Sequence, residues 1–169
     1  MKPLEFHQSN DLFSAQEAFK KLVSTGILSS EGVRSPWFDP VITKLLILLS
    51  DLLKAADRIG KRCTFTNDIL VIDDEISSKI TDVTDLIIRC RAAACHIRSG
   101  NQLFETNKLL MCVGVGKCDL ISIGEKTLGC EYDDDIAVIW GPMRLYLRRH
   151  MMRAFEYVES MFPDPRSCF

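Results

Sequence analysis

The sequence lacks several features that would assign it to a class at once. Its 7 cysteines include no Cys-x-x-Cys pair, and 21 basic against 23 acidic residues leave a net charge of only −2. The cysteine spacing fits no common zinc module, and the most apolar run, residues 45–53, is too short to cross a membrane. These absences argue against a zinc finger, a membrane-spanning protein and a globally basic nucleic-acid binder.

What is present is typical of a globular protein. A chain of 169 residues, 47% hydrophobic and 26% charged, can bury a core without a metal or a disulfide. Residues 1–10 contain one lysine and no apolar segment of signal-peptide length, and the odd cysteine count favours reduced thiols. We therefore expect a single cytoplasmic domain over residues 1–169, with no cofactor, no bound metal and no membrane partner.

Hydrophobic periodicity predicts four helices, at about residues 11–24, 39–60, 82–98 and 142–162. The second has the clearest limits, because Asp39 can cap it, Pro40 suits its first turn and Gly60 suits its end. Its apolar face is so wide that it either lies deep in a bundle or also packs against a second chain. β-favouring residues at about 109–140 predict a small antiparallel hairpin or meander. The expected fold is mainly α, an antiparallel helical bundle with this β insertion before the last helix.

Arginine and histidine lie close together near the end of the predicted third helix, between Arg89 and His96. An arginine stays charged and can bind a phosphate with a forked pair of hydrogen bonds, while an imidazole can exchange a proton near neutral pH. On a straight helix, positions seven apart share a face, so Arg89 is the better neighbour of His96. Arg91 then points away, alongside Arg98.

The four residues between Arg91 and His96 resemble the Arg-x4–6-His signature of HEPN domains, and Arg89 with His96 fits the same pattern. The resemblance extends, less specifically, from about residue 45 to residue 162. It implies a HEPN-like bundle that forms a homodimer and cleaves single-stranded RNA without a metal, by attack of the 2′-hydroxyl on the adjacent phosphate. His96 would transfer the proton, and Arg91 or Arg89 would bind the phosphate. It also implies, loosely, a toxin–antitoxin or antiphage-defence protein with an antitoxin or other partner protein.

Other interpretations stay open for the same residues. In HEPN nucleases a polar residue commonly follows the arginine, whereas Ala92 follows Arg91. This departure favours the alternative of a non-catalytic dimerisation or binding module that holds a partner protein, RNA or nucleotide. In a purely structural role, Arg89 would pair with Asp85 four residues earlier. A metal site using nearby cysteines is disfavoured, because one helix cannot easily aim Cys90 and Cys95 at one ion.

A basic segment follows later in the chain. Residues 143–154, on the predicted last helix, include Arg144, Arg148 and Arg149 and contain no acid. Together with Arg98 they predict an RNA-binding surface, although a solvated helix face is the plainer interpretation. The acidic run at 133–135 predicts a solvated turn or a contact for a partner protein.

Overall fold

The computed structural model describes residues 6–65, 79–96, 100–104, 107–108 and 110–162. Its elements, in chain order, are α1 (Phe6–Val23), η1 (Gly32–Arg34), α2 (Phe38–Arg58), α4 (Val83–Cys95), η2 (Gly100–Gln102), β1 (Leu103–Phe104), β2 (Asn107–Lys108), β3 (Cys112–Val115), β4 (Cys118–Ile123), β5 (Lys126–Cys130), β6 (Ile136–Trp140), β7 (Met143–Tyr146), η3 (Leu147–Met152) and α5 (Arg153–Glu159). The fold is mixed α/β, so the expectation of a mainly α protein was too narrow. The antiparallel β region before the last helix is confirmed.

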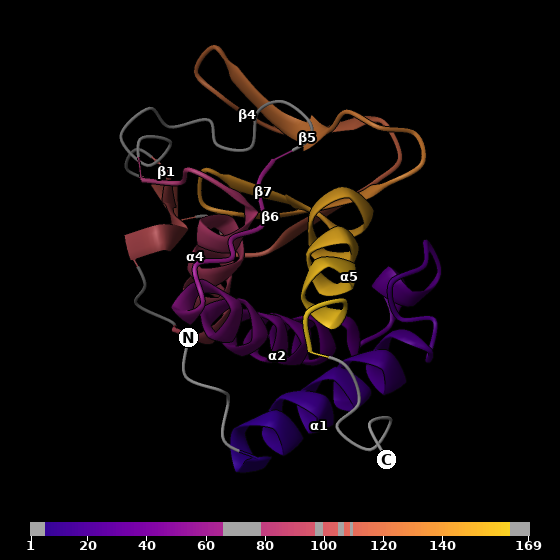
Figure 1. Ribbon diagram of the computed structural model, residues 1–169. Helices are drawn as coiled ribbons and strands as arrows, with labels where there is room; N and C mark the ends of the chain where they lie inside the picture. Colours follow the sequence, from indigo (N-terminus) through magenta and orange to yellow (C-terminus); the bar gives the residue numbers. More distant parts are fainter. Residues whose placement is uncertain (1–5, 66–78, 97–99, 105–106, 109, 163–169) are drawn as a thin grey trace.

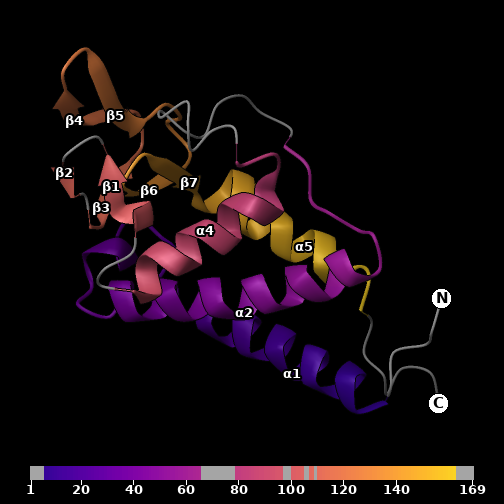
Figure 2. The same ribbon diagram turned by 90° about the vertical axis from the view of Figure 1, so that its left-hand side faces the viewer.

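The elements are arranged in layers along the molecule. Helices α1 and α2 lie at one end and the β4–β5 hairpin at the other, with α4 and α5 between them (Figures 1 and 2). Strands β3, β6 and β7 form one antiparallel sheet in the order β3-β6-β7, and β4 pairs with β5. In that three-stranded sheet, Val138 of β6 faces Val113 on one side and Leu145 on the other.

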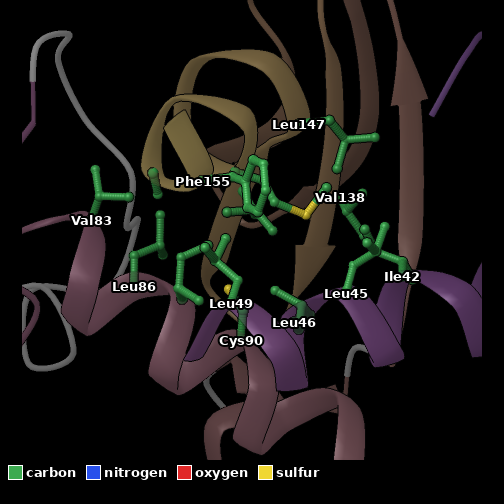
Figure 3. Packing of buried hydrophobic residues seen from close by; sticks show 14 of the residues in the cluster. Ile42, Leu45, Leu46, Leu49, Val83, Leu86, Cys90, Val138, Leu147 and Phe155 are labelled. Atoms are coloured by element: carbon green, nitrogen blue, oxygen red, sulfur yellow. The ribbon is translucent and has the colours of Figure 1, made fainter. Parts of the chain in front are cut away.

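Helix α2 is the centre of the hydrophobic core. It packs against α1, α4 and α5, and its buried residues are Phe38, Ile42, Leu45, Leu46, Leu49, Ser50, Leu52, Leu53 and Ala56. Figure 3 shows side chains of α2, such as Leu45 and Leu49, meeting Leu86 of α4, Val138 of β6 and Phe155 of α5. The wide apolar face is thus covered by the chain itself, and no second chain is needed to explain it.

The first three predicted helices are confirmed, with shifted ends. Helix α1 begins at Phe6, five residues before the predicted start, and α2 ends at Arg58, just before the predicted end. Helix α4 ends at Cys95 rather than at residue 98. Among the described residues, no helix is both long enough and apolar enough to cross a membrane.

The predicted last helix over residues 142–162 is wrong in its first part. Met143–Tyr146 form strand β7, the six residues of η3 are a π-helix, and only Arg153–Glu159 are α-helical. A Gly-Pro pair suits either a helix start or a tight turn, and here Gly141 has φ 54° in the two-residue turn between β6 and β7. All four β7 residues are buried, so the strand shows no alternation that would distinguish it from a helix.

We expect Leu49→Ala to lower the free energy of unfolding by about 2–5 kcal/mol, because Leu49 is fully buried at the centre of the core. Urea denaturation monitored by circular dichroism measures this loss. The matched control is Asp51→Ala on the exposed side of the same helix, which should change stability by less than about 0.5 kcal/mol. Equal stability of the two variants would show that α2 is not the centre of the core.

Candidate functional site

The C-terminal end of α4 carries the predicted catalytic residues. The helix begins after Asp82, whose side chain accepts a hydrogen bond from the backbone N–H of Asp85 at 2.9 Å. It ends at Cys95, and His96 has extended backbone angles, φ −123° and ψ 110°. Arg89 and Arg91 lie within the helix, but the helical period no longer sets the direction of the His96 side chain. The preference for Arg89 over Arg91 as its neighbour, which assumed a helix to residue 98, is therefore lost.

The side chains of Arg89, Arg91 and His96 differ in burial, but none of them has a hydrogen-bond or ion-pair partner among the described residues. His96 is exposed, while Arg89 and Arg91 are half-buried. The Nε atom of Arg91 is buried and has no hydrogen-bond partner among the described residues. Within the described part of the chain, no ion pair or side-chain hydrogen bond involves any of the three. Arg98 lies outside the described residues.

The acidic residues at the start of α4, Asp82 and Asp85, are paired with Arg62 rather than with Arg89. Arg62 Nε donates to Asp82 Oδ2 at 2.6 Å, and Arg62 Nη2 donates to Asp85 Oδ1 at 2.6 Å. Asp85 also accepts a hydrogen bond from the Thr81 hydroxyl at 2.7 Å. The Asp85–Arg89 pair of the structural interpretation is therefore not formed, and Arg89 keeps its charge unneutralised by Asp85.

The expected basic surface at residues 143–154 is not present in the predicted form. Arg144 lies on β7, where its side chain is only 4% exposed. Its Nη2 donates to Glu131 Oε1 at 2.7 Å, and its Nη1 donates to the carbonyl of Gly129 at 3.2 Å. Arg144 thus joins β7 to the end of the β4–β5 hairpin instead of facing solvent.

The other two predicted RNA-binding arginines are paired with the acidic run. Arg148 is exposed and forms an ion pair with Asp134 at 3.1 Å. Arg149 pairs with Asp134 at 2.7 Å and with Asp135 at 3.1 Å, and its guanidinium lies 3.7 Å from the ring centre of Tyr132. Because Arg144 is buried and these carboxylates offset the charges of Arg148 and Arg149, the three predicted RNA-binding arginines of this segment do not form an uncompensated basic surface.

Asp135 is a buried carboxylate at the start of the last helical segment. Its Oδ1 accepts hydrogen bonds from the backbone N–H groups of Ile136, at 2.8 Å, and Arg148, at 2.9 Å. Its Oδ2 accepts from the backbone N–H and the Nη1 of Arg149, both at 3.1 Å. The first N–H groups of a helix have no partner within the helix, so Asp135 caps η3 from a distant loop. The expectation that residues 133–135 form a simple solvated turn is wrong for Asp135.

His150 is fully buried next to this cap. The backbone N–H of Tyr146 donates to His150 Nδ1 at 3.0 Å, so the imidazole is neutral with its proton on Nε2. Burial lowers the pKa of His150 to about 3, and the positive charges of Arg153, Arg144 and Arg149 add to this effect. A neutral imidazole with its Nδ1 occupied serves here as a structural group rather than as a proton donor or acceptor near pH 7.

Sequence reasoning missed the structural roles of Glu131, Asp135 and His150. The available signal was an acidic run thirteen or fourteen residues before an arginine-rich run, with a turn-forming Gly-Pro pair between them. That pattern indicates a hairpin that brings the two runs together.

The thiol of Cys90 is fully buried in the core, and among the described residues no group of three or more metal-ligating side chains is arranged to hold a metal ion.

We expect Asp135→Ala to lower the free energy of unfolding by about 2 kcal/mol or more, because it leaves the partly buried N–H groups at the start of η3 without their acceptor and removes the partner of the Arg149 guanidinium. Chemical denaturation provides the measurement. Asp133→Ala is the matched control, since Asp133 is exposed and belongs to the same run. A loss in the control equal to that in Asp135→Ala would contradict the capping role.

We expect acid to destabilise the protein through His150. Its ordinary pKa of about 6.5 in the unfolded chain exceeds its folded pKa of about 3, so stability is complete above pH 6.5 and falls as the pH drops toward 3. Between pH 7.5 and 5.5 the loss should be about 1.4 kcal/mol, and smaller in His150→Gln. An NMR titration in which the wild-type His150 ring is protonated near pH 6.5 would contradict this prediction.

Comparison of the chain with protein-family models gives no match, and comparisons with curated proteins and with solved structures give none either.

Proposed function

We propose that this chain is a HEPN-type endoribonuclease that cleaves single-stranded RNA as a dimer, without a metal, using His96 and Arg91 or Arg89. The observation that carries the proposal is that two arginines of α4, close to His96 along the chain, lack the carboxylate partners that several other arginines of the fold have. Arg62, Arg144 and Arg149 are each bound to carboxylates. Arg89 and Arg91, next to an exposed histidine, have no carboxylate partner among the described residues.

An RNA phosphate suits the unpartnered end of α4. The Arg91 Nε is buried without an acceptor among the described residues, so an incoming phosphate would meet the rest of the guanidinium. A phosphate oxygen there would accept charge-assisted hydrogen bonds and neutralise the arginine. Because His96 is exposed and follows the last helical residue, it is accessible to the same ligand.

The reaction assigned to these residues is a transesterification. The 2′-hydroxyl attacks the adjacent phosphorus, the new O2′–P bond forms and the P–O5′ bond breaks, leaving a cyclic phosphate and a 5′-hydroxyl. One imidazole removes the proton of the attacking hydroxyl, and a proton is returned to the leaving oxygen. The arginine stabilises the charge that develops on the phosphate oxygens. In a dimer, two such histidines would divide the two proton transfers between them.

A second candidate function is a non-catalytic binding module. It is favoured by Ala92, which follows Arg91 where HEPN nucleases commonly have a polar residue, and by the pairing of Arg148 and Arg149 with Asp134. With those arginines neutralised, the affinity for RNA has to come mainly from the end of α4. Such a module would bind RNA or a partner protein through the same arginines and leave it intact.

We expect the purified protein to cleave a labelled single-stranded RNA in EDTA, and His96→Ala to reduce the rate about 100-fold or more. Arg91→Ala and Arg89→Ala are compared in the same assay, and the variant with the larger loss of cleavage rate identifies the phosphate-binding arginine. The control is Arg34→Ala, an exposed arginine in η1. All variants should unfold at the wild-type temperature, because His96 is exposed and the other side chains are at most half-buried.

A substrate with 2′-deoxyribose at the cleaved position should resist cleavage, since it lacks the attacking hydroxyl. Light scattering of the same sample measures whether the chain is a dimer. Full activity of His96→Ala would contradict the proposal. RNA binding by the wild-type protein without any cleavage would support the second candidate.

A further inference from the structure

Two cysteines face each other at the open end of the β4–β5 hairpin. Cys118 is the first residue of β4, Cys130 is the last residue of β5, and the two are Cα partners in the antiparallel register. Directly opposed residues of an antiparallel pair have Cα atoms about 4.5–5.5 Å apart and side chains on the same face. A disulfide requires a Cα separation of about 4.4–6.8 Å, so the register places this pair within reach of one.

Two glycines show how closely the chain is packed around Cys118. A Cβ atom added to Gly129 would lie 1.9 Å from the carbonyl oxygen of Cys118, so only glycine allows the strands to approach at this point. A Cβ atom added to Gly114 would lie 2.9 Å from the Cys118 sulfur. The Cys118 thiol therefore rests against the backbone of β3, beside the strand end that carries Cys130.

The two thiols differ in accessibility. Cys130 is buried, and its Sγ donates a hydrogen bond to the carbonyl of Tyr132 at 3.3 Å. Burial raises the pKa of the Cys130 thiol, and the nearby Cys118 contributes in the same direction. Cys118 is half-buried, so an oxidant from solvent reaches it first.

The other described cysteines have no comparable neighbour. Cys112 of β3 faces Ile139 across the sheet. Cys63 and Cys90 are buried in the core, and Cys95 lies at the end of α4. Among the described residues, Cys118 and Cys130 are thus the one pair of thiols that the strand register places opposite each other.

We propose that Cys118 and Cys130 form a reversible cross-strand disulfide when a peroxide oxidises the protein. The Cys118 thiolate attacks one oxygen of hydrogen peroxide, the O–O bond breaks, and the released hydroxide takes up a proton to become water. The Cys130 thiolate then attacks the sulfenic sulfur of Cys118, the S–S bond forms, and the S–O bond breaks with loss of a second water. Two thiols are oxidised and one peroxide is reduced.

Closing this disulfide changes the contacts of Tyr132, which lies next to Arg149. The Cys130 sulfur gives up its hydrogen bond to the Tyr132 carbonyl, and the ring of Tyr132 lies over the Arg149 guanidinium. The bond also fixes the two ends of the hairpin to each other. Oxidation is therefore a modification of the β region, at residues other than the proposed nuclease residues of α4.

The test uses trypsin, because cleavage after Lys117, Lys126 and Arg144 places the two cysteines in separate peptides, 118–126 and 127–144, with one cysteine each. The full-length protein is treated with hydrogen peroxide, remaining thiols are blocked with N-ethylmaleimide under denaturing conditions, and the digest is examined by mass spectrometry. We expect the two peptides to be linked and 2 Da lighter than their sum. Treatment with dithiothreitol before blocking should return both in the thiol form.

Cys112→Ser is the matched control, since Cys112 is also half-buried and in the β region, and it should keep the link. Cys118→Ser should abolish it. The proposal is overturned if wild-type protein forms no link while the Cys118 peptide carries sulfinic or sulfonic acid. It is also overturned if other cysteine pairs link as efficiently as this one.

Discussion

The carboxylate of Asp135 joins the β region to the last helical segment. One side chain accepts hydrogen bonds from the first residue of β6 and from the first turn of η3, which are separated along the chain by the whole of β6 and β7. This arrangement fixes the angle at which the chain leaves the sheet, and so places Phe155 of α5 against the core. Arg149 is held at the same junction through its ion pair with Asp135, and its positive charge contributes to the lowered pKa of the nearby His150.

Several arginines of the protein differ in whether they meet a carboxylate. Arg62, Arg144 and Arg149 neutralise carboxylates and connect separate elements of the fold, so their charges contribute little to an external field. Arg89 and Arg91 of α4, a few residues before the exposed His96 along the chain, have no carboxylate partner among the described residues. The net charge of −2 therefore says little about local charge, which depends on which arginines meet a carboxylate in the fold.

Much of the helical part could be predicted from local signals. The periodicity of residues 39–60 predicted α2 and its wide apolar face, and the structure realises the first of the two alternatives, a helix deep in the core. The start of α4 was predicted at about residue 82, and the helix begins at Val83 after the Asp82 cap. The β7 strand could not be distinguished from a helix, because Met143–Tyr146 are buried on all sides and follow a Gly-Pro pair that suits either structure. The position of His96 was also beyond local reasoning, since it depends on where α4 ends.

The sequence by itself determined the main helices, the β insertion and the closeness of Arg91 and His96 along the chain, because these depend on interactions between near neighbours. Tertiary structure decided which charges are neutralised. Asp134 and Asp135 meet Arg148 and Arg149 only because the β6–β7 hairpin folds the two segments together. The same pairing of distant segments places Cys118 opposite Cys130, since strand register is set by contacts across the sheet and not by spacing along the chain.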